Sequence, residues 1–220
     1  MPATPQSQLT GVTRTVTPTA GGHVVALAQT FPVGAEELWS ALTTGSRLAL
    51  WFGRAGGELV EDGRYELPDM ETHGRVKAVE APRRLLLSWE FGSGRSELEL
   101  LLEPVPDVSD EEGEKEGTTR FTLRHTVPDD AHWATFGPAA TGCGWDAALY
   151  PLALHLEDPT TAQLQRMAHF AASREGAEFV RATADAWYEA HVAAGSDRKP
   201  ARKASVRTAA FYLGEETDLP

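Results

Sequence analysis

Residues 32–53, PVGAEELWSALTTGSRLALWFG, predict two short helices that follow one another along the chain. In the first helix, Leu38, Trp39 and Leu42 recur at the spacing that places side chains on one face. Two glutamates occupy its first turn, where the helix dipole favours negative charge, and Gly45 marks its end. The stretch therefore predicts a helix that presents one apolar stripe to a core.

The second helix covers about residues 46–51 and delivers Trp51 and Phe52 to a glycine-rich break at residues 53–57. A strand precedes both helices, because residues 23–31 are rich in β-branched and apolar side chains. We therefore expect the two helices to lie between this first strand and the strands that follow.

The middle of the chain predicts an antiparallel meander. Apolar and polar side chains alternate, so that Leu87 and Trp89 share one face and Ser88 lies on the other. Glutamates of residues 96–103 and arginines of residues 118–126 both face outward, which favours charge pairing between neighbouring strands. We expect one curved sheet with a polar and an apolar face. Its meander strands are predicted at residues 58–60, 64–67, 73–80, 84–91, 96–103 and 118–126.

The last third of the chain predicts helices. A segment of about residues 138–156 aligns Trp145 and Leu149 on one face, and two further helices are expected near residues 159–172 and 174–194. The apolar stripes of these last two helices must be buried, either on the domain or across a two-fold axis, because a lone amphipathic helix is marginal in water. Of the two arrangements, we favour a homodimer.

These features divide the chain into four parts. Residues 1–22, rich in Thr, Pro and Gly, are expected to form a flexible leader, and residues 23–156 form the α+β domain. Residues 157–195 form a helical extension. Residues 196–220 are interpreted as a tail with a solvated basic cluster.

Composition excludes several classes of protein. Hydrophobic residues make up 41% of the 220 residues, enough for a core, and 32 acids against 20 bases give a net charge of −12. Such a surface repels nucleic acids and anionic membranes. No apolar run approaches the roughly 20 residues of a membrane helix, and the N-terminus lacks a signal-like apolar stretch, so we expect a cytoplasmic protein. The sequence contains no Ile, no Asn and few Lys, which indicates a GC-rich bacterial genome.

The sequence shows none of the common catalytic motifs, and we expect no catalytic residues, metal or cofactor. The single cysteine, Cys143, excludes an internal disulfide and a zinc site of several thiolates. The acidic segment 106–117 lacks the ligand spacing of a calcium loop and is interpreted as a solvated, flexible hairpin loop. Strand alternation places His125 on the apolar face. It either orients a ligand or acts as a general base, or it is a structural histidine bonded to a carbonyl group or water.

A strongly curved sheet closed by one long helix tends to leave a hollow, and the aromatic side chains are predicted mostly on inward faces. The alternative is a core that these side chains fill. If the hollow is open, it is the expected site for a small molecule. The predicted ligand-binding residues are Trp51, Phe52, Leu87, Trp89, Phe91, Phe121, Leu123, His125, Trp145 and Leu149.

Three motifs carry a resemblance to a known family: the spacing of Pro32, Glu36 and Trp39, the step Trp51-Phe52-Gly53, and the pair Gly144-Trp145. With the order of elements, they resemble bacterial proteins similar to the C-terminal domain of the activator of heat-shock protein 90 ATPase. These belong to the START-like (SRPBCC) helix-grip superfamily. The resemblance covers about residues 23–156 and implies an α+β helix-grip fold, a curved antiparallel sheet of about six to seven strands around a long C-terminal helix.

The superfamily includes lipid carriers, cyclases and hormone-binding proteins, so the resemblance implies a cavity between sheet and helix. We expect non-catalytic binding of a small hydrophobic or aromatic molecule there. One alternative is an enzyme of the cyclase or hydratase type that uses His125. The other is a stress-response module that contacts a chaperone.

Overall fold

The computed structural model describes residues 2–106 and 117–216, and the acidic segment 107–116 lies outside them. Within these ranges, eight antiparallel strands form one sheet in the order β1-β2-β8-β7-β6-β5-β4-β3. This arrangement is the α+β fold that the sequence predicts, with one strand more than expected. The strands are β1 (Thr13–Thr19), β2 (Gly22–Phe31), β3 (Gly56–Gly57), β4 (Arg64–Leu67), β5 (Thr72–Glu80), β6 (Arg84–Phe91), β7 (Gly94–Val105) and β8 (Thr118–Pro128).

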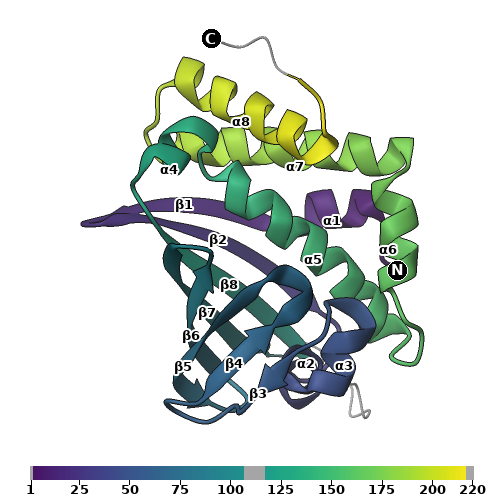
Figure 1. Cartoon of the computed structure of the whole chain (residues 1–220). Helices are drawn as coiled ribbons and strands as arrows, with labels where there is room; N and C mark the ends of the chain where they lie inside the picture. Colours follow the sequence, from purple (N-terminus) through teal and green to yellow (C-terminus); the bar gives the residue numbers. More distant parts are fainter. Residues whose placement is uncertain (1, 107–116, 217–220) are drawn as a thin grey trace.

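The helices form two layers on one side of the sheet (Figure 1). The long helix α5 lies against the sheet, and α7 and α8 pack on the other side of α5, while α2 and α3 lie together at one end. The helices are α1 (Pro5–Gly11), α2 (Ala35–Thr43), α3 (Gly45–Trp51), the 3₁₀ turn η1 (Pro68–Met70), α4 (Ala131–Phe136), α5 (Ala139–Glu157), α6 (Leu164–Ala171), α7 (Arg174–Ala193) and α8 (Arg198–Leu213).

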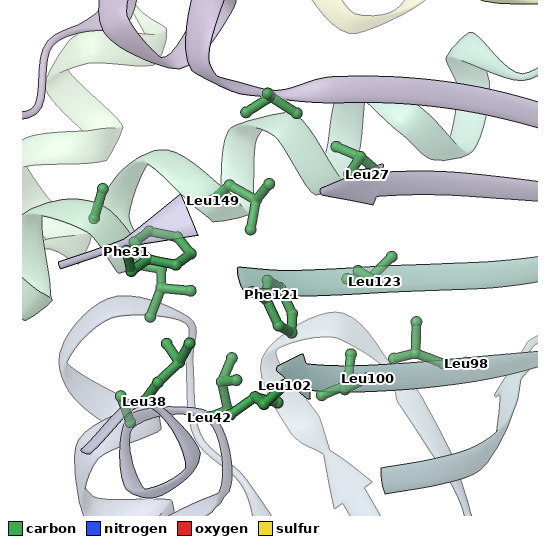
Figure 2. Packing of buried hydrophobic residues seen from close by; sticks show 14 of the residues in the cluster. Leu27, Phe31, Leu38, Leu42, Leu98, Leu100, Leu102, Phe121, Leu123 and Leu149 are labelled. Carbon is green, nitrogen blue, oxygen red and sulfur yellow. The ribbon is translucent and has the colours of Figure 1, made fainter. Parts of the chain in front are cut away.

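The register confirms the predicted alternation. Leu87 of β6 pairs with Leu98 of β7, which pairs with His125 of β8, so these three side chains share the inward face. Figure 2 shows apolar side chains of α2, α5 and the sheet pointing toward one another, with Leu149 above Phe121. The core therefore lies between the concave face of the sheet and the helices.

The outward face of the sheet carries the expected charge pairs. Glu99 of β7 lies opposite Arg124 of β8, and the Arg124 Nη1 atom is 3.0 Å from a carboxylate oxygen of Glu99. The other oxygen accepts from Arg84 Nε at 2.8 Å. This face is therefore a polar surface, whereas the apolar side chains of the strands lie on the inward face.

The leader expected at residues 1–22 is not flexible over its described part, residues 2–22, because these contain α1 and β1. Thr4 and Ser7 cap α1 reciprocally, and β1 pairs along its whole length with β2. The strand was missed because its threonines and Pro18 resemble a linker. The side chains at its inward positions, Arg14 and Val16, are both buried in the protein interior.

The tail and the first hairpin also differ from expectation. Residues 198–213 form α8, which packs along α7 and buries small residues such as Ala201, Ala204 and Thr208. Small side chains allow close packing without the large apolar stripe that marks a buried helix in a sequence. The strand expected at residues 58–60 is replaced by β3, which pairs earlier, at Gly56 and Gly57.

A buried polar network joins β1, α5 and α7. Arg14 donates to both carboxylate oxygens of Asp146 at 2.7–3.1 Å, and Trp187 Nε1 donates to the same carboxylate at 2.8 Å. The side chains of Arg14 and Asp146 are 6% and 1% exposed. Burial raises the pKa of Asp146, and the hydrogen bond from Arg14 counteracts part of that rise. The network therefore holds β1 and α7 against the long helix α5.

Breaking this network should be costly. We expect Arg14→Met to lower the free energy of unfolding by about 3 kcal/mol or more, because it leaves a buried carboxylate without its partner. The double variant Arg14→Met/Asp146→Asn should recover about half of the loss, since the amide oxygen still accepts from Trp187 and no charge remains buried. Urea unfolding measures both values.

The matched control breaks an exposed pair. Arg174→Met removes the Arg174–Glu178 contact of 2.8 Å on α7 and should change stability by about 0.5 kcal/mol or less. Equal losses for Arg14→Met and Arg174→Met would contradict a structural role for the buried network.

The extension packs on the domain through a close helix contact. Trp187 of α7 is fully buried, and its indole lies where a side chain at Gly142 of α5 would be, since a Cβ atom there would stand 2.0 Å from the ring. Ser205 of α8 donates to the carbonyl of Ala184 at 2.9 Å, which ties the last helix to α7. The apolar stripe around Trp187 is thus buried within one chain, and the homodimer stays a prediction.

Gly142→Ala therefore tests how tightly the extension docks. The added methyl collides with a buried ring, and we expect a loss of about 1–3 kcal/mol despite the better helix propensity of alanine. Gly144→Ala on the same helix should cost much less, because its Cβ would meet only the hydroxyl of the exposed Tyr212 side chain, at 3.1 Å, and a small shift of that side chain relieves the contact. Thermal melting of both variants decides the point, and equal effects would rule out close docking.

Candidate ligand cavity

An apolar cavity of about 170 Å³, the inner cavity, lies between the sheet, α3 and α5. Aliphatic side chains from five neighbouring strands, β4 to β8, form its floor, and α5 supplies the opposite wall. The predicted site residues that line it are Trp51, Phe52, Leu87, Trp89, Phe121, Leu123, Trp145 and Leu149. The hollow of the sheet is therefore not wholly filled by side chains.

The other two predicted residues lie outside the inner cavity. His125 is 6% exposed and Phe91, at the end of β6, is 59% exposed. Both line a wider groove of about 740 Å³, the outer groove, which runs between the β6–β7 hairpin, α4 and one face of α5. Phe91 shares the inward face with Leu87, but the strand ends there beyond the cover of the helices.

Four aromatic residues separate the inner cavity from the outer groove, and we call them the aromatic wall: Trp51, Phe52, Trp89 and Trp145 line both spaces. Phe52 stacks nearly parallel to Trp145, with ring centroids 6.3 Å apart, and Trp89 meets Trp145 edge-on at 5.3 Å. Such arrangements are favourable for aromatic pairs. The wall is a continuous aromatic contact between α3, β6 and α5.

A chain of hydrogen bonds fixes the polar side of the wall. The Trp145 Nε1 group can only donate, so at 3.0 Å from His125 Nδ1 it requires an unprotonated Nδ1. The proton of the neutral ring is then on Nε2, which donates to Ser96 Oγ at 2.7 Å, and Ser96 donates to the Trp89 carbonyl at 3.2 Å. Both ring nitrogens of His125 are thereby used.

Burial lowers the pKa of His125 to about 4, because the charged ring is not solvated in this apolar environment. Protonation of Nδ1 would also break the bond from Trp145. His125 therefore points inward, as expected of a group that orients a ligand. Both of its ring nitrogens are nevertheless bonded to protein side chains, as in a structural histidine.

The polar groups on the inner cavity wall are satisfied or reach solvent. Thr43 donates to the Trp39 carbonyl at 2.7 Å, and Tyr65 donates to the Ser88 carbonyl at 2.7 Å, while Glu58 is exposed. Burial raises the pKa of Tyr65 well above its ordinary range, so its hydroxyl stays neutral. The inner cavity can therefore offer contact area to an apolar molecule but little to a charged one.

Sequence reasoning missed several wall residues. Ala148 lines both spaces, and its position on α5 next to Leu149 is the signal that could have found it. Ser96 faces inward by the same period that places Leu98 there. The segment from Ala55 to Leu59, which lies at one side of the inner cavity, has no periodicity that would reveal it.

Among residues 2–106 and 117–216, no cluster of three or more His, Cys, Asp or Glu side chains is arranged to hold a metal ion. The helices of the described residues include none long and apolar enough to cross a membrane.

A curved antiparallel sheet that encloses a long helix, with an apolar cavity between them, defines a START-like helix-grip protein. Residues 32–157 match the family described as activator of Hsp90 ATPase homolog 1-like protein, and the chain belongs to this family. The match begins at the proline before α2 and ends with α5, so it includes the whole inner cavity. No curated protein sequence matches the chain.

Solved structures agree with this fold. The solution structure of CalU16 from Micromonospora echinospora has 25% identity and a TM-score of 0.64, over 84% of this chain and 97% of CalU16. The crystal structure of CalU16 gives 24% identity and a TM-score of 0.56, over 81% and 97%. DynU16, a protein in the dynemicin biosynthetic locus, matches at 24% identity and a TM-score of 0.50, over 63% of this chain and 49% of its own.

The low pKa of His125 predicts how stability depends on pH. The unfolded histidine titrates near 6.5 and the folded one at about 4, so the unfolded state binds more protons between these values. Stability should fall as the pH drops from 6.5 to 4, by on the order of 3 kcal/mol from this group. His155 and His191, whose pKa values are also lowered by burial, act in the same direction.

Urea unfolding between pH 4 and 7 measures this dependence, and His125→Gln isolates the share of His125. The variant should lose a large part of the slope, because glutamine does not titrate. A proton NMR titration should show the His125 ring neutral down to about pH 4. A ring that titrates near 6.5 would contradict the buried hydrogen-bond chain.

Proposed function

We propose that the protein binds a small hydrophobic or aromatic molecule in the inner cavity and does not change it chemically. The chemistry of the cavity wall carries this proposal. Aliphatic and aromatic side chains offer contact area, while the polar groups on the wall are bonded within the protein or face solvent. Burial of apolar surface stabilises a bound molecule by about 25 cal/mol per Å².

The volume of the inner cavity limits the size of the ligand. Typical sites for drug-sized ligands have volumes of about 300–1,000 Å³, whereas this cavity measures about 170 Å³. An apolar cavity of about 150 Å³ in another protein stays dry and admits benzene or xenon. We therefore propose a ligand, or a part of a ligand, about the size of one aromatic ring.

The bonding of His125 favours binding over the cyclase or hydratase alternative. A general base needs a free lone pair near the proton that it takes. The Nδ1 lone pair accepts from Trp145, and Nε2 carries the proton that Ser96 accepts. Action of His125 as a base would require the bond from Trp145 to Nδ1 to break, whereas binding uses the hydrogen bonds as they are.

The chaperone-associated alternative stays a prediction from the family resemblance. It makes a different demand on the molecule, because a co-chaperone would change the ATPase rate of its chaperone with the cavity empty. A ligand-binding protein should instead become more stable when a small molecule fills the inner cavity.

Toluene is a suitable probe, because it presents one apolar ring. We expect it to raise the melting temperature of the protein in a concentration-dependent way, since a ligand that binds only the folded state stabilises that state. Ala148→Leu extends a wall residue into the inner cavity and should weaken toluene binding at least tenfold. Isothermal titration calorimetry measures the affinities.

Ala147→Leu is the matched control. Ala147 lines the outer groove but not the inner cavity, so the same added atoms should leave toluene affinity within about twofold. Toluene that fails to bind the wild-type protein, or binds Ala148→Leu as well as it binds the wild type, would contradict the proposed site.

A further inference from the structure

The four side chains of the aromatic wall differ in how firmly they are held in place. Trp51 Nε1 donates to the carbonyl of Ala41 at 3.1 Å, and Trp145 Nε1 donates to His125, so both indoles are fixed by hydrogen bonds. Trp89 lies within β6, where its backbone pairs with Ser96 of β7. Phe52 lies outside the sheet; its backbone N–H donates to the Leu48 carbonyl at 2.8 Å, but its ring has no polar atom and is held by contacts with the rings of Trp51 and Trp145.

The backbone beside Phe52 is the point where α3 ends. Phe52 is the C-terminal cap of α3, and Gly53 follows with φ = +143°, a backbone conformation that residues other than glycine rarely adopt. The next residue, Arg54, is tied to Asp69 by its backbone N–H at 2.8 Å and by its guanidinium at 2.6–2.9 Å. Phe52 therefore lies at the end of α3, next to Gly53 and one residue before Arg54, which is held by Asp69.

We infer that Phe52 is the specificity-determining residue that divides one apolar site into two compartments and sets the largest ligand that the site accepts. This inference rests on the proposed function. With the ring in place, the inner cavity admits one aromatic ring. With the ring displaced or removed, the inner cavity joins the outer groove of about 740 Å³, and a planar polycyclic hydrocarbon can extend from one into the other.

The composition of the outer groove suits such a ligand. Trp89 and Trp145 of the aromatic wall also line the outer groove, as does the exposed Phe91. The face of α5 that lines it carries small residues, among them Ala140 and Ala147, which leave room for a flat molecule. Planar rings stacked against aromatic side chains gain contact area at favourable geometry.

Affinities for toluene and pyrene test this inference, measured by calorimetry and by pyrene fluorescence. In the wild-type protein toluene should occupy the inner cavity, while pyrene is excluded from it. Phe52→Ala should increase pyrene affinity at least tenfold and weaken toluene binding, because the inner cavity loses a ring from its wall, so the ratio of the two dissociation constants changes by more than tenfold. Phe52→Leu keeps most of the apolar volume and should shift the ratio less, in the same direction.

Phe91→Ala is the control, because it removes an aromatic ring from the outer groove only. It should not raise pyrene affinity. A ratio unchanged within twofold in both Phe52 variants, in proteins that still bind toluene and melt cooperatively, would overturn the inference and leave the proposed function intact. A wild-type protein that does not bind toluene would overturn the proposed function and, with it, the role of Phe52.

Discussion

Two neighbouring residues of α5, Trp145 and Asp146, hold the long helix over the sheet. Trp145 bonds to His125 of β8, and Asp146 bonds to Arg14 of β1 and Trp187 of α7. Successive side chains on a helix point about 100° apart, so the two sets of contacts fix both the height and the rotation of α5. The helix is held where its side chains do not fill the hollow of the curved sheet.

This constraint explains why the inner cavity is preformed. The aliphatic floor comes from hydrogen-bonded strands, and the aromatic wall is braced by the indole bonds of Trp51 and Trp145. A site that is already shaped loses little conformational freedom when a ligand enters, which favours binding even of a small molecule. The neutral His125 ring contributes by accepting the hydrogen bond that holds Trp145 of the wall in place, while the charged side chains of β7 and β8 lie on the outward face of the sheet.

The sequence predicts the local features well because they depend on period and turn chemistry. The inward position of His125 follows from strand alternation alone. Its partners do not, because the bond to Trp145 joins residues 20 positions apart. Arg14 lies in a strand whose composition resembles a linker, and that strand is stabilised by pairing with β2 and by Asp146. Helix α8 packs through alanines, which give no apolar stripe. The volume left between side chains depends on the whole packing, so the cavity could be proposed from the sequence but not measured.

A crystal structure of the protein under xenon pressure tests the central claim most directly, because xenon enters dry apolar cavities and is visible by its electron density. The account predicts xenon in the inner cavity, in contact with Leu100, Leu149 and the aromatic wall. Density for ordered water in that space, or side chains that close it, would contradict the claim that this fold keeps an apolar site ready for a small ligand.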